Sequence, residues 1–353
     1  MKEREYNYDL LRAVSAFAVV LGHVAALFIE TAQWDYFDGL PMNHPLVSVV
    51  ITALCRFSVP AFLMLSGAFV LSSPKSADAP AFYRRSWRHV GIPAAAAMIA
   101  GVLYSLFCGL VLDHTGVMPA LEALISGAPF YHLWYLPVMA GTYLLAPWIC
   151  RFREAVSPGV FAKTAAAMTV AGCLGLWLNP PVASHWNIGE AFCYTGYFML
   201  GCVLRVSNRE KSGGWMFIAA ALLLHACSGI LVYRAVFLNG MDRALAEHRF
   251  FMSYAPLTVI ASVLMFTGFA RLKIRSGTGL FAANTYGIYL VHAFLLDIIS
   301  RTARAVNGQR WLCHLDARIA APVLAVIVYL LSCGAGILLH RIRLSLNAKT
   351  VKA

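Results

Sequence analysis

The sequence predicts an all-α, polytopic membrane protein with about ten transmembrane helices and both termini in the cytoplasm. Of its 353 residues, 60% are hydrophobic and only 12% are charged, whereas soluble domains carry about 25% charged residues. The mean hydropathy is +0.69, and long apolar runs alternate with short basic clusters. This pattern excludes a disordered chain and a soluble globule. We expect one membrane domain over residues 1–353, with no appended soluble domain.

The transmembrane helices are predicted from the length of the apolar runs, because about 20 apolar residues cross about 30 Å of hydrocarbon. Ten segments meet this criterion: 9–30, 46–71, 91–112, 131–150, 160–178, 190–205, 214–233, 253–270, 279–299 and 319–340. An even number places both termini on one side of the membrane. The loops on that side carry 19 Lys and Arg residues, against seven on the opposite side. The positive-inside rule therefore places the termini in the cytoplasm.

Charge and cysteine usage exclude several classes of partner. The net charge of +12 lies in short clusters between apolar runs, so membrane topology explains it and we expect no nucleic-acid partner. The nine cysteines form no CxxC pair, so we expect neither a disulfide framework nor a metal site. A homo-oligomer stays open, because lipid-facing and partner-facing helix surfaces have similar compositions.

The first predicted helix carries the ionisable residues Asp9, Arg12 and His23 along one face. A charged side chain at mid-membrane costs about 2.5–3.5 kcal/mol on insertion scales, so it needs a compensating role. At about 100° per residue, the step from Arg12 to His23 ends about 20° beyond three full turns, and Asp9 lies on the same face. A cation at the cytoplasmic end and a deep imidazole base favour a catalytic role. The structural alternatives are an anchoring Arg12–Asp9 pair and a helix-packing His23.

The second predicted helix, 46–71, places Arg56 far from both of its ends. Its guanidinium cannot easily reach the membrane surface, so we expect it to face a polar cavity or a buried carboxylate. It is a candidate oxyanion- or substrate-binding group, and a structural ion pair is the alternative. Pro60 removes one backbone hydrogen bond from this helix. Ser66 is a further candidate for substrate contact, with helix packing as its alternative.

The following segment, FYRRSWRHVGIP, is predicted to be a loop at the cytoplasmic mouth of the third helix, with Arg84, Arg85 and Arg88. Guanidinium groups bind phosphate in a bidentate manner, and aromatic faces such as Tyr83 and Trp87 suit a purine. The segment therefore indicates a site for a phosphate-bearing donor. Positive-inside anchoring is the alternative.

Further polar residues lie at membrane depth in the later helices. His132 lies near the outer interface and Glu190 at the start of the sixth helix, and both are candidates for substrate contact. His292 and Asp297 lie in the ninth helix. Five residues correspond to about 140° around a helix, so these two are not expected to pair.

The sequence resembles the acyltransferase-3 family of integral membrane acyltransferases over essentially its whole length. Arg12, ten intervening residues and His23 match the Arg-X10-His motif of that family. The segment SVPAFLMLSGAF (58–69) is similar to its helix-two pattern, Arg85 and Arg88 to its cytoplasmic Arg-x-x-Arg element, and YHLWYL and YGIYLVH to later signatures. Within the family, the spacing in the first, second and fourth helices most resembles the enterobacterial common antigen O-acetyltransferases.

The resemblance implies an O-acetyltransferase of the bacterial inner membrane. Such an enzyme takes an acetyl group from cytoplasmic acetyl-CoA and gives it to a hydroxyl of an envelope polysaccharide or its undecaprenyl-linked precursor. Acetyl-CoA is then a donor substrate, and no permanently bound cofactor is implied. The catalytic role falls on His23 and Arg12, with Asp9 beside them. Arg85 and Arg88, next to Arg84, are implied to meet the CoA phosphates.

Two questions stay open from the sequence. Transfer can proceed directly, with His23 as general base, or through an acyl-histidine intermediate. A transporter or flippase of a lipid-linked sugar is the alternative function, because it would share the helix number, the intramembrane charges and a Pro-broken helix. Against it, the chain shows no repeated half, and its arginines cluster at the mouth where a nucleotide-like donor would arrive.

Overall fold

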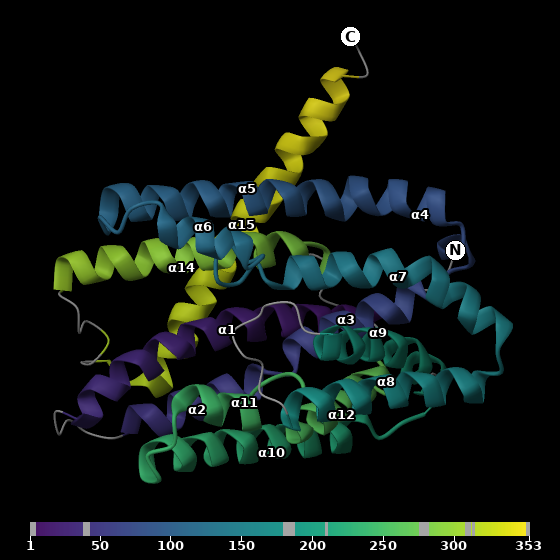
Figure 1. The fold of residues 1–353 in the computed structure, drawn as a ribbon, viewed down its shortest axis with the longest axis horizontal. Helices are drawn as coiled ribbons and strands as arrows, with labels where there is room; N and C mark the ends of the chain where they lie inside the picture. The colour runs from purple at the N-terminus through teal and green to yellow at the C-terminus, as the bar shows by residue number, and fades with distance from the viewer. Residues whose placement is uncertain are drawn as a thin grey trace. The chain divides into compact units, whose positions relative to one another are not determined.

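A computed structural model describes residues 5–37, 43–178, 188–208, 211–274, 282–307, 312 and 315–350. These residues are mostly helical and contain no strand (Figure 1). The predicted all-α class is therefore confirmed. Several residues used in the charge and cysteine counts lie outside the described residues: Lys2, Arg4, Arg209, Arg275, Arg310, Cys313 and Lys352.

Each of the ten predicted segments is helical over most of its described length. The corresponding helices are α1 (Tyr6–Phe37), α2 (Asn43–Cys55) with α3 (Ser58–Val70), α5 (Ile92–Phe107), α7 (Tyr135–Ala155), α8 (Pro158–Leu178), α9 (Ile188–Asn208), α10 (Gly214–Tyr233), α12 (Pro256–Ala270), α14 (Thr285–Asn307) and α15 (Ala317–Thr350). Of the predicted segment 279–299, residues 279–281 lie outside the described part.

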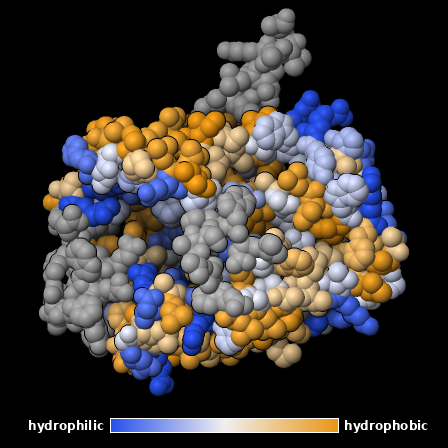
Figure 2. All heavy atoms as spheres, viewed as in Figure 1, coloured by the Kyte–Doolittle hydropathy of each residue, from blue (hydrophilic) through white to orange (hydrophobic). Residues whose placement is uncertain are grey.

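The helices identify a multi-pass membrane protein. Six stretches of the described residues are long and apolar enough to cross a bilayer: Tyr6–Ile29, Pro45–Val70, Ala79–Leu112, Pro158–Leu178, Gly214–Leu238 and Ala317–Leu339. The apolar helix α12 is shorter. Large apolar side chains such as Ile99 and Leu103 on α5 are exposed, and apolar residues cover much of the visible surface (Figure 2). Lipid contact accounts for this exposure. The count of ten spans and the cytoplasmic termini stay predictions.

The segment predicted as a loop before the third helix is helical, and that prediction is wrong. Helix α4 (Ala79–Ser86) continues through the π-helical turn η2 (Trp87–Gly91) into α5. The helix begins at Asp78, whose carboxylate accepts a hydrogen bond from the backbone N–H of Ala81 at 3.3 Å. This N-cap satisfies a backbone donor that the first turn leaves open. The three arginines are thus held on a helix rather than on a loop.

Two other helix boundaries differ from the prediction. The second predicted helix is broken, because α2 ends at Cys55 and α3 begins at Ser58. Pro60 has no N–H to donate to the carbonyl oxygen of Arg56, which explains why the helix is interrupted there. The fourth predicted helix begins at Tyr135 rather than at residue 131, so His132 lies in the preceding turn.

The chain folds into two compact units, here called unit 1 (Met1–Phe62 with Asn208–Ala353) and unit 2 (Leu63–Ser207). In unit 1, α1 packs against α2, α12, α14 and α15, and α10 packs against α2 and α12. Between α10 and α12, the π-helical turn η4 (Arg234–Leu238) leads to the short helix α11 (Arg243–Phe250). Unit 2 contains α4 to α9, including the short helix α6 (Met118–Ile125), the π-helical turn η3 (Cys108–Leu112), the 3-10 turn η1 (Pro74–Ser76) and most of α3.

Glycines set the closest helix crossing in unit 2, between α3 and α9. A Cβ atom at Gly201 would overlap the backbone carbonyl of Met64, and one at Gly67 would overlap that of Phe198. Small residues permit such close backbone approach between membrane helices. The crossing is reinforced by the Nη1 of Arg205, which donates to the carbonyl oxygen of Ala68 at 2.9 Å.

We predict that Gly201→Ala destabilises the protein strongly, whereas Gly141→Ala on α7 does not. The added methyl at position 201 meets backbone that cannot move independently, and overpacking of this kind typically costs about 1–3 kcal/mol or more. A methyl at position 141 meets nothing within 4 Å. Heat unfolding of the two purified variants in detergent measures the difference, and equal unfolding temperatures would contradict the close crossing.

Candidate functional site

His23 lies within unit 1, at the contact of α1 with α2 and α14. The preceding residue, Gly22, lets α2 come close: a Cβ at Gly22 would lie 3.2 Å from the Cβ of Cys55. On its other side, the imidazole of His23 packs against that of His292, with ring centroids 5.3 Å apart. His23 is half-buried. The imidazole on α1 therefore packs against α14 while keeping some accessible surface.

Arg56 occupies the break between α2 and α3, next to this contact. Its guanidinium lies over the ring of Phe251, 4.9 Å from the centroid. Its Nε is buried and has no hydrogen-bond partner. Arg56 directly follows Cys55, whose Cβ lies 3.2 Å from a Cβ placed at Gly22, the neighbour of His23. Arg56 and His23 are therefore each one residue away from the same close contact between α1 and α2.

The positive charge of Arg56 has no ion-pair partner among the described residues. Glu247 on α11 interacts with it electrostatically, but the carboxylate of Glu247 is already bonded to the Nε of Arg243 at 2.8 Å. The expected alternative for Arg56, a direct structural ion pair, is thus not seen. A cation held in this way suits an anion or an oxygen atom that gains negative charge during a reaction.

His292 has a defined hydrogen-bonding role on α14. Its Nδ1 lies 3.1 Å from the carbonyl oxygen of Ile288 and 2.8 Å from that of Tyr289. Carbonyl oxygens only accept hydrogen bonds, so Nδ1 carries the hydrogen and, in the neutral ring, Nε2 keeps the lone pair. The ring that packs against His23 is therefore fixed by its own helix backbone.

Two ion pairs form locally, one on each of these two helices. The Nη1 of Arg12 donates to the carboxylate of Asp9 at 3.0 Å, which is the anchoring pair considered from the sequence. Arg12 and His23 are eleven residues apart on α1, which corresponds to about 16 Å along the helix. Asp297 pairs with Arg301 at 2.7 Å and not with His292, as expected from their spacing.

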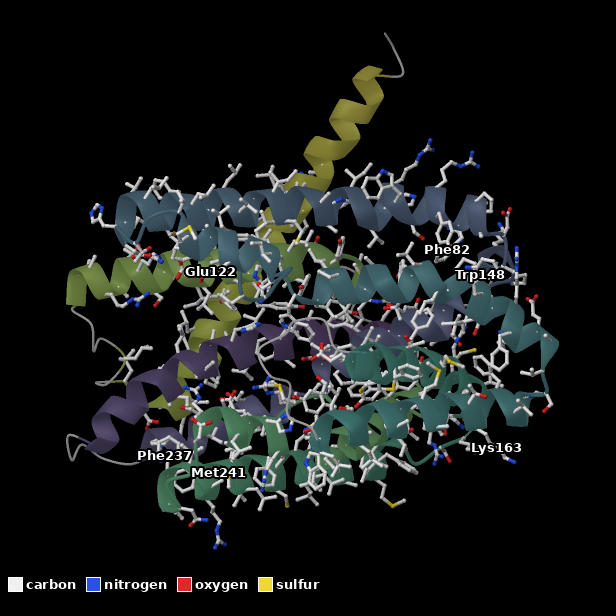
Figure 3. All side chains as sticks on the ribbon, viewed as in Figure 1. Phe82, Glu122, Trp148, Lys163, Phe237 and Met241 are labelled. Carbon is white, nitrogen blue, oxygen red and sulfur yellow. The ribbon has the colours of Figure 1, made fainter. Side chains whose placement is uncertain are left out.

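In unit 2, Arg84, Arg85 and Arg88 of α4 and η2 lie on one face of the helix. Their side chains start within about 100° of one another around the helix axis. All three are exposed. The opposite face is anchored: the hydroxyl of Tyr83 donates to the carbonyl oxygen of Leu144 at 2.7 Å. The buried ring of Phe82 lies 5.9 Å from that of Tyr143 on α7 (Figure 3). The helix thus presents guanidinium groups on a fixed support.

The remaining predicted residues also lie in unit 2. His132 is buried between the rings of Phe130 and Tyr131, at centroid distances of 5.6 and 5.8 Å. The nearby ring of Trp134 lies 6.1 Å from that of Tyr194 on α9, one turn after the partly buried Glu190. Ser66 is half-buried on α3. The structure therefore brings the turn of His132 towards the start of α9.

One residue of unit 1 was missed by the sequence analysis. His225 on α10 is fully buried, and its ring lies 6.2 Å from that of Phe57, directly after Arg56. A single histidine in an apolar run offers no positional pattern, so only the packing of α10 on α2 reveals its place. Among the described residues, no cluster of His, Cys, Asp or Glu fits a metal ion.

Comparisons with known proteins agree with these features. A family profile described as an acyltransferase domain, that of the acyltransferase-3 family, matches residues 5–341. Comparisons with curated proteins and with solved structures found no significant match. The matched range includes all of the predicted site residues and both units, so the chain belongs to the acyltransferase-3 family of membrane acyltransferases.

Proposed function

We propose that this acyltransferase moves an acetyl group from cytoplasmic acetyl-CoA to a hydroxyl of a cell-envelope polysaccharide or its undecaprenyl-linked precursor. The observation that carries the proposal is that His23 and Arg56 both adjoin the close contact of α1 with α2 in unit 1, and that Arg56 has no ion-pair partner among the described residues. The choice of an envelope glycan rests on the resemblance to the enterobacterial common antigen O-acetyltransferases. The enzyme would act in the bacterial inner membrane, as a monomer or a homo-oligomer.

The donor's phosphates are assigned to Arg84, Arg85 and Arg88. Guanidinium groups bind phosphate oxygens through charge-assisted, bidentate hydrogen bonds. The side chain of Trp87 on the same helix is 60% exposed and offers a flat face for the adenine ring. Acetyl-CoA binds as a substrate and leaves as CoA, so no permanently bound cofactor enters the proposal.

The chemistry requires a base and a site for negative charge. In direct transfer, His23 removes the proton from the acceptor hydroxyl while its oxygen attacks the thioester carbonyl carbon. Negative charge then gathers on the carbonyl oxygen, where the N–H groups of Arg56 can stabilise it by about 3–4 kcal/mol. The carbon–sulfur bond breaks, and the CoA thiolate takes up the proton held by His23.

A second route uses His23 as the nucleophile. Its ring nitrogen would form an acetyl-imidazole, release CoA and then pass the acetyl group to the hydroxyl. Arg56 would serve both tetrahedral intermediates in the same way. In either route, Arg12 and its partner Asp9 fix the cytoplasmic part of the α1 face. His132, Glu190 and Ser66 stay assigned to contacts with the substrates.

We predict that His23→Gln inserts normally but loses acetyl transfer, because glutamine keeps a polar side chain but cannot act as a base or a nucleophile. Label transfer from radiolabelled acetyl-CoA to extracted glycan or glycolipid, with CoA release, measures this loss. His114→Asn is the matched control, since His114 is exposed in a loop with a positive φ of 53° that asparagine tolerates. Substantial transfer by His23→Gln would remove the catalytic role. Protection of the wild type from heat unfolding by a lipid-linked sugar alone would favour the transporter.

We predict that the double variant Arg85→Ala, Arg88→Ala raises the apparent KM for acetyl-CoA with little change in membrane insertion. The sharper comparison uses acetyl-dephospho-CoA, which lacks the 3′-phosphate. If these arginines contact that phosphate, the wild type loses affinity for the analogue, while the double variant no longer distinguishes the two donors. An unchanged KM for acetyl-CoA would instead make both residues topology anchors.

A further inference from the structure

Several buried polar side chains in the described part of unit 1 have atoms without hydrogen-bond partners, and three of these side chains lie on α10, on α12 and at the break between α2 and α3. They are the imidazole of His225, the Nε of Arg56 and the hydroxyl of Ser262. His225 and Ser262 are fully buried, and neither nitrogen of His225 is bonded. A buried polar atom without a partner loses its hydrogen bonds to water and gains none in return, which destabilises the folded protein. Such a cost calls for a ligand or another compensating role.

His225 and Ser262 lie at the same level of neighbouring helices. The hydroxyls of Ser228 on α10 and Thr258 on α12 both donate to the carbonyl oxygen of Phe250. Further along, the close approach of Gly214 to Gly268 shows that the helices run antiparallel. His225 precedes Ser228 by three residues and Ser262 follows Thr258 by four, so each lies one turn further on the same face.

Arg56 lies close to the level of α10 that carries His225. The ring of His225 is 6.2 Å from that of Phe57, the residue after Arg56. One turn away, Gly229 on α10 approaches Val50 and Ala53 on α2. His225 therefore lies next to the break between α2 and α3 that carries Arg56, and Ser262 lies at the level of His225 on the neighbouring helix α12. Irregular backbone at membrane depth is typical of substrate sites, where half-helix ends and freed carbonyls line the site.

We infer that His225, Arg56 and Ser262 form the acceptor subsite, and that it takes the hydroxyl groups of an uncharged sugar ring. The inference rests on the proposed function and names the chemistry of its acceptor. A neutral imidazole has one donor and one acceptor, a serine hydroxyl has both, and Arg56 adds N–H donors. Hydroxyl groups on adjacent ring carbons, which also donate and accept, match this set.

An acidic sugar matches less well. A carboxylate or phosphate offers only acceptors, so it would leave the acceptor atoms of His225 and Ser262 unpaired beside it. Placing a hydroxyl here also brings it next to Arg56, the group assigned to the thioester oxygen. The subsite would thus hold the acceptor where the negative charge develops.

The test compares wild type with His225→Leu, in the full-length protein in detergent. Leucine removes both ring nitrogens without breaking an existing hydrogen bond, so the unfolding temperature should not fall. The half-saturating amount of a glycolipid fraction from the host membranes should rise about tenfold, as expected for one lost buried hydrogen bond. Half-saturation by acetyl-CoA should not change. His225→Gln, which keeps a donor and an acceptor, should recover part of the affinity.

The matched control is Ser48→Ala, which removes another buried, unpartnered hydroxyl two turns before Arg56 and should leave acceptor saturation unchanged. The same fraction should protect wild type from heat unfolding without acetyl-CoA, and His225→Leu should lose this protection. Equal protection of the two proteins, protection of neither, or equal acceptor saturation would overturn the subsite. A marked loss of stability in both His225 variants would overturn it in favour of packing. Failure of the proposed function gives a different result: the wild-type protein itself would then transfer no label from acetyl-CoA.

Discussion

A positive charge inside a membrane protein must be compensated, and the site of this acyltransferase is organised around one such charge, Arg56. Its guanidinium packs on Phe251, and the described residues provide no carboxylate within ion-pair distance. The helix that carries it is interrupted between Cys55 and Ser58, where Pro60 offers no N–H to the carbonyl of Arg56. Arg56 therefore combines a charge that has no ion-pair partner among the described residues with a position at a break in the helix. That combination is costly for stability alone and useful for a reaction that creates negative charge.

The surrounding helices each contribute to holding this arrangement. Helix α1 carries His23 next to Gly22, the residue at which α2 approaches closely. On α14, backbone carbonyl groups fix the ring of His292, which packs against the ring of His23. Phe251, which directly follows α11, places its ring against the guanidinium of Arg56. The carbonyl oxygen of the preceding residue, Phe250, accepts hydrogen bonds from Ser228 on α10 and Thr258 on α12. Rigid elements thus position the base and the cation, as electrostatic stabilisation of a transition state requires.

Much of the fold follows from the sequence, because hydrophobic runs of about 20 residues determine where membrane helices form. The shared face of Arg12 and His23 follows from helix periodicity alone. The packing partners do not: which imidazole meets His23, and that His225 lies beside Phe57, depend on how distant helices associate. The helical form of residues 79–90 was also missed, since its polar arginines suggested a loop while the Asp78 cap and its buried aromatic face favour a helix.

The most direct test of this account is the steady-state kinetics of Arg56→Met, measured together with its heat unfolding. Methionine keeps most of the length of the side chain and removes the charge. Since Arg56 has no ion-pair partner among the described residues, the account predicts an unfolding temperature that is unchanged or higher. It also predicts a kcat about 10²–10³-fold lower, as for loss of one oxyanion donor, with little change in the KM for acetyl-CoA. An unchanged kcat, or a loss of activity explained by unfolding, would contradict it.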